Sequence, residues 1–226
     1  MKVTVLLSGG IDSTTCLGKA VSENGRENVT ALSVFYGQKH SKELEAARKI
    51  AKYYDVEHIE IDLAPMFRYS DCSLLSGSEN DIPEESYADQ LEKRGGKPVT
   101  TYVPFRNGLF LASAASIALS KGCSEIMYGA HSDDAAGSAY PDCSSAFNDA
   151  MNTAVWEGSG KQLRINAPFV NMTKADVIKT GLKLNVPYEM TWSCYAGGDS
   201  PCGVCGTCRD RAAAFAENGI ADPALK

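Results

Sequence analysis

The sequence predicts an α/β fold: a doubly wound parallel sheet followed by a small C-terminal metal-binding knot. Apolar runs of strand length alternate with amphipathic segments along most of the chain, which is the order of parallel βαβ units. Polar loops follow the first, second and fourth runs, at the sheet edge where such folds bind ligands. From Thr191 the composition shifts to Cys, Gly and Ser, which indicates a different local architecture.

The strands and helices can be assigned in chain order. Strands are expected where short segments are apolar or alternate in polarity, at 3–7, 29–36, 58–63, 125–130 and 163–167. Helices are expected at about 11–22, after His40, over 108–121, up to about 157, after Thr173 and over about 209–218. The helix after Thr173 begins with a capping box, in which Thr173 and Asp176 satisfy the end N–H groups reciprocally.

Residues 64–100 do not fit this alternation. Ser, Gly, Asp, Glu and Lys dominate the segment, and its periodicity is weak. A long stretch of this kind inside a compact domain is often a lid or a mobile excursion with short helices. An ordinary surface insertion explains the composition equally well, so both interpretations stay open.

Composition limits the class of protein. The 226 residues are 44% hydrophobic, which supports a substantial core, and carry a net charge of −6. A nonspecific nucleic-acid binder is expected to have a basic surplus instead. No segment is apolar for long enough to span a membrane, and the N-terminus shows no secretory leader. We therefore expect a cytoplasmic protein with small-molecule partners, and neither nucleic acid nor a membrane among them.

The strongest motif follows the first expected strand. The string Ser8-Gly9-Gly10-Ile11-Asp12-Ser13 lets the backbone approach a ligand closely and opens a helix whose free N–H groups favour an anion. It is similar to the signature of the ATP pyrophosphatase (PP-loop) enzymes, which split ATP between its α and β phosphates. The resemblance implies ATP binding by Leu7, Ser8, Gly9, Gly10, Ile11, Asp12, Ser13, Thr14, Thr15, Cys16 and Leu17.

The second strong motif is a cluster of four cysteines, Cys194, Cys202, Cys205 and Cys208. Four thiolates with glycine-containing turns suit a closed tetrahedral site, for which Zn²⁺ is the usual metal. An iron–sulfur cluster is the rival, because Cys-x2-Cys-x2-Cys also occurs in ferredoxin-type sites. We favour structural zinc, since a four-cysteine shell leaves no open position for catalysis.

Several charged residues are candidates for catalysis. Lys174 lies at the positive end of a helix, where a nearby anion would explain a cation. Arg106 is a candidate clamp on phosphate or carboxylate. Asp12 either holds Mg²⁺ on the triphosphate or caps its helix, and the sequence does not separate the two roles.

The loop after the fourth strand holds the candidates for substrate binding. Asp133 and Asp142 can accept the paired N–H donors of a guanine-like ring, or they are ordinary turn aspartates. His131, like His40 in an earlier loop, flanks the ligand-facing edge and is a candidate substrate ligand.

Taken together, the motifs resemble the 7-cyano-7-deazaguanine synthase family of the queuosine pathway. The strings that carry the resemblance are those above together with Tyr-Gly-Gln-Lys-His at 36–40, Val-Pro-Phe-Arg-Asn at 103–107 and Tyr-Pro-Asp-Cys at 140–143. It runs from Met1 to about Arg211. It implies a Rossmann-like sheet of the adenine nucleotide α hydrolase type, ATP, Mg²⁺ and structural Zn²⁺, and a homodimer. The implied reaction converts 7-carboxy-7-deazaguanine and ammonia to the nitrile through an adenylated carboxylate and an amide.

The resemblance also implies roles for individual residues. Asp12, Arg106 and Lys174 would be catalytic, and the deazaguanine pocket would be formed by His131, Asp133, Tyr140 and Asp142. The PP-loop domain would span 1–190, with 191–226 as a zinc-binding segment packed on it. The rivals are an amide-stopping PP-loop relative, an iron–sulfur RNA thiolase, and a non-enzymatic zinc-knuckle binding protein.

Overall fold

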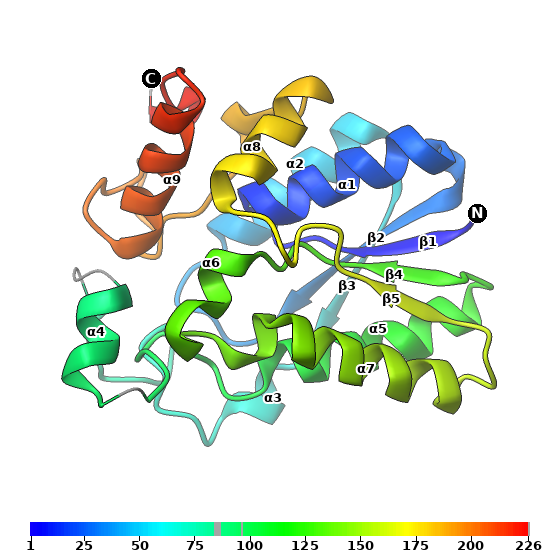
Figure 1. The fold of residues 1–226 in the computed structure, drawn as a ribbon, viewed down its shortest axis with the longest axis horizontal. Coiled ribbons are helices and arrows are strands. Elements are labelled where there is room, and N and C mark those ends of the chain that lie inside the picture. The colour runs from blue at the N-terminus through cyan, green and yellow to red at the C-terminus, as the bar shows by residue number, and fades with distance from the viewer. Residues whose placement is uncertain (84–86, 96, 226) are drawn as a thin grey trace.

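The computed structural model describes residues 1–83, 87–95 and 97–225 (Figure 1). Among these residues lies one sheet of five parallel strands in the order β3-β2-β1-β4-β5. The strands are β1 (Val3–Leu6), β2 (Val29–Phe35), β3 (Glu57–Asp62), β4 (Glu125–Met127) and β5 (Arg164–Asn166). The prediction of a doubly wound parallel sheet is confirmed.

Helices cover both faces of this sheet (Figure 1). One face carries α1 (Ile11–Asn24), α2 (Lys42–Tyr54) and α8 (Lys174–Lys183), and the other carries α5 (Arg106–Ser120) and α7 (Ser145–Gly158). Each face has its own apolar core. β1 and β2 are buried on both sides of the sheet, which is why they are almost continuously apolar in sequence.

The fourth strand is shorter than the expected 125–130 and ends at Met127. The chain then passes the first turn of α1 so closely that a Cβ on Gly129 would lie 2.7 Å from the carbonyl oxygen of Asp12. Glycine is therefore required at this position. The close passage brings the loop after β4 beside the loop after β1.

The described part of 64–100 contains α3 (Ala64–Phe67) and α4 (Tyr87–Lys93). Phe67, Leu74 and Leu75 form a small apolar cluster with Tyr36 and Val103, which anchors the segment to the main domain. Residues 84–86 and 96, which the expected lid also included, lie outside the described residues.

The C-terminal segment belongs to the same body as the sheet. Its helix α9 (Gly206–Glu217) begins three residues before the expected 209, and Phe215 is fully buried in the core that contains Ile178 of α8. Arg211 forms a buried ion pair with Asp222, with 2.5 Å between Nε and Oδ2. The remaining short elements are η1 (Arg26–Asn28), α6 (Ser132–Ala135), η2 (Ala136–Ser138), η3 (Pro141–Cys143), η4 (Tyr188–Met190) and η5 (Pro223–Leu225).

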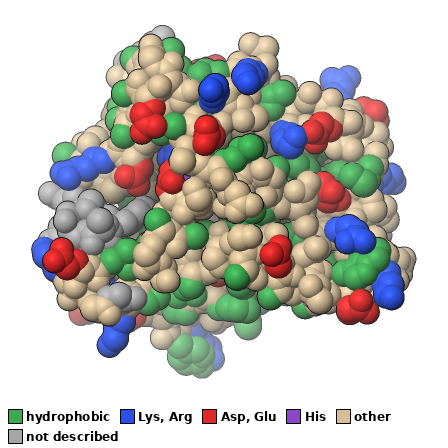
Figure 2. Space-filling view, viewed as in Figure 1, with side chains coloured by type: hydrophobic (Ala, Val, Ile, Leu, Met, Phe, Trp, Pro, Cys, Tyr) green, Lys and Arg blue, Asp and Glu red, His purple; other side chains and the backbone are tan. Residues whose placement is uncertain are grey.

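The surface is mixed in charge on the face shown in Figure 2, where acidic and basic side chains are interspersed. Within the described part of the chain, none of the helices has the length and apolar character needed to cross a bilayer.

Candidate active site

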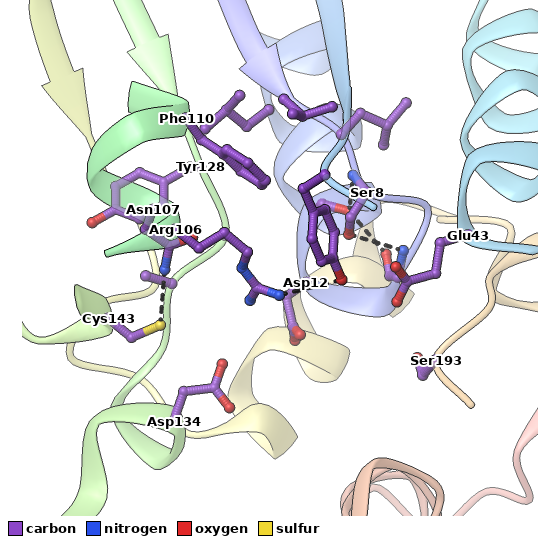
Figure 3. Close-up of a pocket in the computed structure, with 18 of the residues that line it drawn as sticks. Ser8, Asp12, Glu43, Arg106, Asn107, Phe110, Tyr128, Asp134, Cys143 and Ser193 are labelled. Carbon is purple, nitrogen blue, oxygen red and sulfur yellow. Dashed lines mark hydrogen bonds between the residues drawn. The ribbon is translucent and has the colours of Figure 1, made fainter. Parts of the chain in front are cut away.

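A cavity of about 210 Å³ opens at the carboxyl ends of β1, β2 and β4. It lies where the strand order changes direction, between β1 and β4, which is the usual ligand site of a doubly wound sheet. Figure 3 shows side chains converging on it from the loop after β1 and from α1, α2, α5 and α6. Its charged and aromatic lining includes Asp12, Tyr36, Glu43, Arg106, Phe110, Tyr128, Asp134, Lys174 and Trp192.

The loop after β1 depends on its glycines. Gly9 has a φ of +89°, and a Cβ there would lie 2.3 Å from the backbone carbonyl oxygen of Glu43. Gly10 precedes α1 as its N-cap and offers no side chain to bond the first N–H groups. The uncapped helix start faces the cavity, an arrangement that suits a phosphate.

Hydroxyl groups hold the loop in this shape. The Ser8 and Ser13 hydroxyls are 3.0 Å apart, and the Ser8 N–H donates to Ser13 Oγ at 3.2 Å. Thr14 and Thr15 donate to carbonyls one turn earlier within α1, at 2.7 and 2.8 Å. Of the expected ATP-binding residues, five line the cavity: Leu7, Ser8, Gly10, Asp12 and Ser13. The other six do not line it and support the loop or the core: Gly9, Ile11, Thr14, Thr15, Cys16 and Leu17.

A charged network adjoins the helix start. Asp12 Oδ2 lies 3.5 Å from Lys174 Nζ and 3.6 Å from Nε2 of the buried His131, which is itself 3.3 Å from Asp134 Oδ2. Burial raises the pKa of Asp12, but Lys174 and His131 outweigh burial and hold this pKa well below the usual carboxyl range. Burial lowers the pKa of Lys174 and of His131, but the neighbouring aspartates raise both above their ordinary values. Asp12 and Lys174 are therefore charged at neutral pH, and the raised pKa of His131 favours its protonated form.

Arg106 approaches the cavity from the first turn of α5. Its Nη1 lies 3.4 Å from the Tyr36 hydroxyl, and its guanidinium carbon is 5.3 Å from the centre of the Tyr36 ring. The planar group is thereby oriented while its other donors remain directed into the cavity (Figure 3). The structure thus brings all three predicted catalytic residues, Asp12, Arg106 and Lys174, to one cavity.

The residues predicted to bind the deazaguanine ring divide into two groups. Tyr140 lines the cavity, and its hydroxyl is 2.5 Å from Thr101 Oγ1. The carboxylates of Asp133 and Asp142 instead accept backbone N–H groups at helix starts, from Lys174 of α8 and Asn107 of α5, each at 2.8 Å. Neither these two side chains nor His131 lines the cavity.

Two carboxylates that line the cavity, Glu43 and Asp134, were missed in the sequence. Glu43 is the third residue after the string Tyr-Gly-Gln-Lys-His, so its position at the start of the helix that follows this loop was the available signal. Asp134 is adjacent to the predicted Asp133, and the turn of α6 decides which of the two side chains faces the cavity.

The four predicted metal ligands do come together. The Sγ atoms of Cys194, Cys202, Cys205 and Cys208 all lie within 4.8 Å of one another. The Cys202 N–H donates to Cys194 Sγ at 3.2 Å, and the Cys205 N–H donates to Cys202 Sγ at 3.4 Å. Such donors stabilise thiolates, so the set fits a tetrahedral metal ion.

The cysteine cluster is connected to the glycine loop by the chain that enters it. The Trp192 N–H donates to the Gly9 carbonyl at 2.9 Å, and Trp192 Nε1 donates to the Cys194 carbonyl at 2.8 Å. Thr207, on the first turn of α9, bonds the Ser193 carbonyl at 2.6 Å. Trp192, Ser193 and Thr207 also line the cavity, so the cluster braces one side of it.

Comparison with known proteins decides the family. The model of the queuosine biosynthesis protein QueC family matches residues 2–219. The chain belongs to this family.

Relatives in this family match over nearly their whole length. The 7-cyano-7-deazaguanine synthase of Archaeoglobus fulgidus is 46% identical over 226 residues, with 100% of this chain and 90% of that protein covered. The synthase of the same name from Caldicellulosiruptor saccharolyticus is 42% identical, with 99% and 94% covered. The resemblance predicted from the motifs is therefore confirmed.

Solved structures outside the QueC family share the fold. The NMN synthetase of Francisella tularensis superposes with a TM-score of 0.53 at 18% identity, with 99% of this chain and 80% of that chain covered. The U34-tRNA thiolase NcsA of Methanococcus maripaludis, solved with its [4Fe-4S] cluster, gives 0.50 at 16% identity, with 96% and 66% covered. At these identities the comparison concerns the fold alone.

Proposed function

We propose that this chain catalyses the ATP-dependent conversion of 7-carboxy-7-deazaguanine and ammonia to 7-cyano-7-deazaguanine, through an adenylated carboxylate and an amide. Relatives that are 46% and 42% identical bear the name of that synthase. The observation that carries the proposal is the uncapped start of α1 beside Lys174, whose Nζ lies 3.5 Å from Asp12. An anion such as the pyrophosphate end of ATP fits there.

A carboxylate needs activation before ammonia can attack it, because its oxygens are poor leaving groups. Adenylation supplies AMP as the leaving group, ammonia then gives the amide, and a second activation of the amide oxygen allows elimination to the nitrile. The protein's contribution is positioning and charge stabilisation. Lys174 and the α1 N–H groups hold the phosphates, Arg106 steadies phosphate or the substrate carboxylate, and Tyr140 borders the ring.

In this proposal Asp133 and Asp142 act indirectly, by positioning other residues. Each carboxylate fixes the start of the helix that presents a cavity cation, Lys174 on α8 and Arg106 on α5. His131 similarly orients Asp12 and Asp134 from outside the cavity lining. These three residues therefore shape the pocket as positioning groups.

Asp12 is the residue that fits a magnesium ion. Its Oδ1 atom is buried and has no hydrogen-bond partner among the described residues, although its carboxyl is ionised. Such an oxygen is a typical ligand for Mg²⁺. When bound, the ion would neutralise charge on the triphosphate.

We infer that the cysteine cluster holds structural Zn²⁺. Four mutually close Sγ atoms with backbone N–H donors suit a closed site, and all four protein ligands are supplied by this chain. Metal analysis of the purified protein tests this, and an iron–sulfur chromophore would contradict it. We also propose a homodimer that acts in the cytoplasm with free ammonia.

The function is tested by incubating the protein with Mg·ATP, ammonium and 7-carboxy-7-deazaguanine and analysing the products by mass spectrometry. We expect the nitrile with the wild type and a loss of about 10²–10³-fold in rate with Asp12→Ala, because the variant removes the proposed Mg²⁺ ligand from the phosphate site. Amide without nitrile would indicate an amide-stopping enzyme. No turnover by folded, metal-loaded protein would contradict the deazaguanine substrate.

A further inference from the structure

Three carboxylates line the cavity, and they differ in their partners. Asp12 faces Lys174 and His131, and Asp134 faces His131. The side chain of Glu43 has neither a hydrogen bond nor an ion pair with any residue that the structure describes. It is therefore the carboxylate of this wall that is free to receive a cation or a proton.

Glu43 is held at a fixed place relative to the glycine loop after β1. It lies in the first turn of α2, where its own carbonyl packs against Gly9. Figure 3 shows its side chain near Ser8, across the cavity from Arg106. The Glu43 carboxyl group therefore faces the same cavity as the glycine loop and Arg106.

The amide-forming step creates a need for such a group. Ammonia is present mainly as ammonium at neutral pH, since cations of the amine type titrate well above 7. Ammonium has no lone pair and cannot attack a carbonyl carbon. A carboxylate attracts the cation and can remove its proton.

We propose that Glu43 forms an ammonium site in this cavity and acts as the base that converts ammonium to ammonia for amide formation. This inference rests on the proposed function. Ammonium transfers one proton to the Glu43 carboxylate, and the nitrogen lone pair forms the C–N bond. The C–O bond to AMP breaks, AMP leaves with that electron pair, and the nitrogen releases a second proton to solvent.

The electrostatics of the site agree with this role. Burial raises the pKa of Glu43 to about 7, and the positive charge of Arg106 opposes the rise. The other charged groups of the cavity are Asp12, Asp134 and Lys174. Tyr36 and Tyr195 interact with Arg106, and Tyr36 also interacts electrostatically with Glu43. A base that titrates near the working pH transfers protons most effectively.

The test compares Glu43→Gln with wild type and with Glu45→Gln, a matched change on α2 outside the cavity lining. The kcat/KM for total ammonium is measured from about pH 7 to about pH 9.5. We expect Glu43→Gln to lose roughly 10²-fold at the lower pH. The deficit should close as pH rises, because free ammonia then enters without a base. Glu45→Gln should follow the wild type throughout.

A second assay supplies the amide as substrate, because its dehydration to the nitrile uses no ammonium. Glu43→Gln should convert the amide at a rate within about threefold of wild type, which also shows that its site is intact. A deficit that is constant with pH, or an equal loss in the amide assay, would overturn the inference and place Glu43 in ATP or ring binding. Failure of the wild type in both assays would instead contradict the proposed function.

Discussion

The two sides of the cavity hold negative charge in opposite ways. On one side Asp12, Lys174, His131 and Asp134 form a network in which each charge faces an opposite charge within 3.6 Å. On the other side Glu43 has no such partner among the described residues, and burial raises its pKa to about 7. Pairing keeps a group charged over a wide pH range, whereas isolation lets it titrate near neutrality. The first side suits phosphate binding, and the second suits proton transfer.

The largest effect is expected from Lys174→Ala, which removes the ion pair between Lys174 and Asp12. Asp12 then remains partly buried without its main counter-charge, and the proposed phosphate site loses a cation. We expect kcat/KM for ATP to fall by about 10²–10³-fold. The free energy of unfolding should fall by about 1–3 kcal/mol.

Lys179→Ala is the control for this change. Lys179 lies on the same helix and is exposed. It should leave both quantities unchanged within about 0.5 kcal/mol. Steady-state kinetics and chemical denaturation measure them, and equal behaviour of the two variants would show that the network is not needed.

An intermediate effect is expected when the cysteine cluster, which supports the glycine loop through Trp192, is disrupted by Cys205→Ser or by chelation. Trp192 bonds the Gly9 carbonyl from the chain that enters the cluster, so loss of metal frees the loop that contacts both α1 and α2. We expect kcat/KM for ATP to fall by about 10–100-fold, although no cluster cysteine lines the cavity.

Cys123→Ala separates this effect from a general loss of core packing. Cys123 is buried at the end of the sheet away from the cluster and belongs to the core on the α5 face. It should retain its metal and most of its activity while losing some stability. If the metal-free protein bound ATP as tightly as the loaded one, the brace would have no functional role.

The smallest expected effect is a pH-dependent difference in the free energy of unfolding, caused by the unpaired Glu43. The folded pKa of Glu43 is about 7 against an ordinary value of 4.5, so the folded state binds the proton more tightly than the unfolded state. Wild-type stability should therefore decline from about pH 4.5 to about pH 8 relative to Glu43→Gln. We expect a difference of about 1–2 kcal/mol, after allowance for partial exposure.

Denaturation at a series of pH values measures this decline, with Glu45→Gln as reference. Glu45 accepts a hydrogen bond from Ser41 at 2.5 Å outside the cavity, so its loss should not reproduce the same pH dependence. Parallel curves for wild type and Glu43→Gln would show that the carboxyl is not perturbed by burial.

The elements built from short-range patterns were predictable from sequence. Buried strands such as 29–36, the Thr173 capping box and the glycine loop depend on neighbouring residues, and the structure contains all of them. The four cysteines were predictable because metal ligation imposes a recognisable spacing.

Features that depend on long-range packing were not predictable. Asp133 and Asp142 look like ring ligands in sequence, but helix starts that are 41 and 35 positions away in the chain occupy their carboxylates. In sequence Glu43 resembles an ordinary helix residue, because its proximity to Gly9 and Arg106 arises only from the tertiary fold. The buried Arg211–Asp222 pair likewise had no local signal.

The contact between Gly9 and Glu43 has a consequence for transplanting this loop into another protein. Because the Gly9 Cα fits directly against the first turn of α2, the shape of the glycine loop depends on that helix as well as on the loop's own hydrogen bonds. A designer who copies residues 8–15 alone would transfer the loop sequence without the packing against α2 that shapes the loop. The smallest portable unit is β1, the start of α1 and the start of α2 together, two segments separated in the chain that behave as a single part.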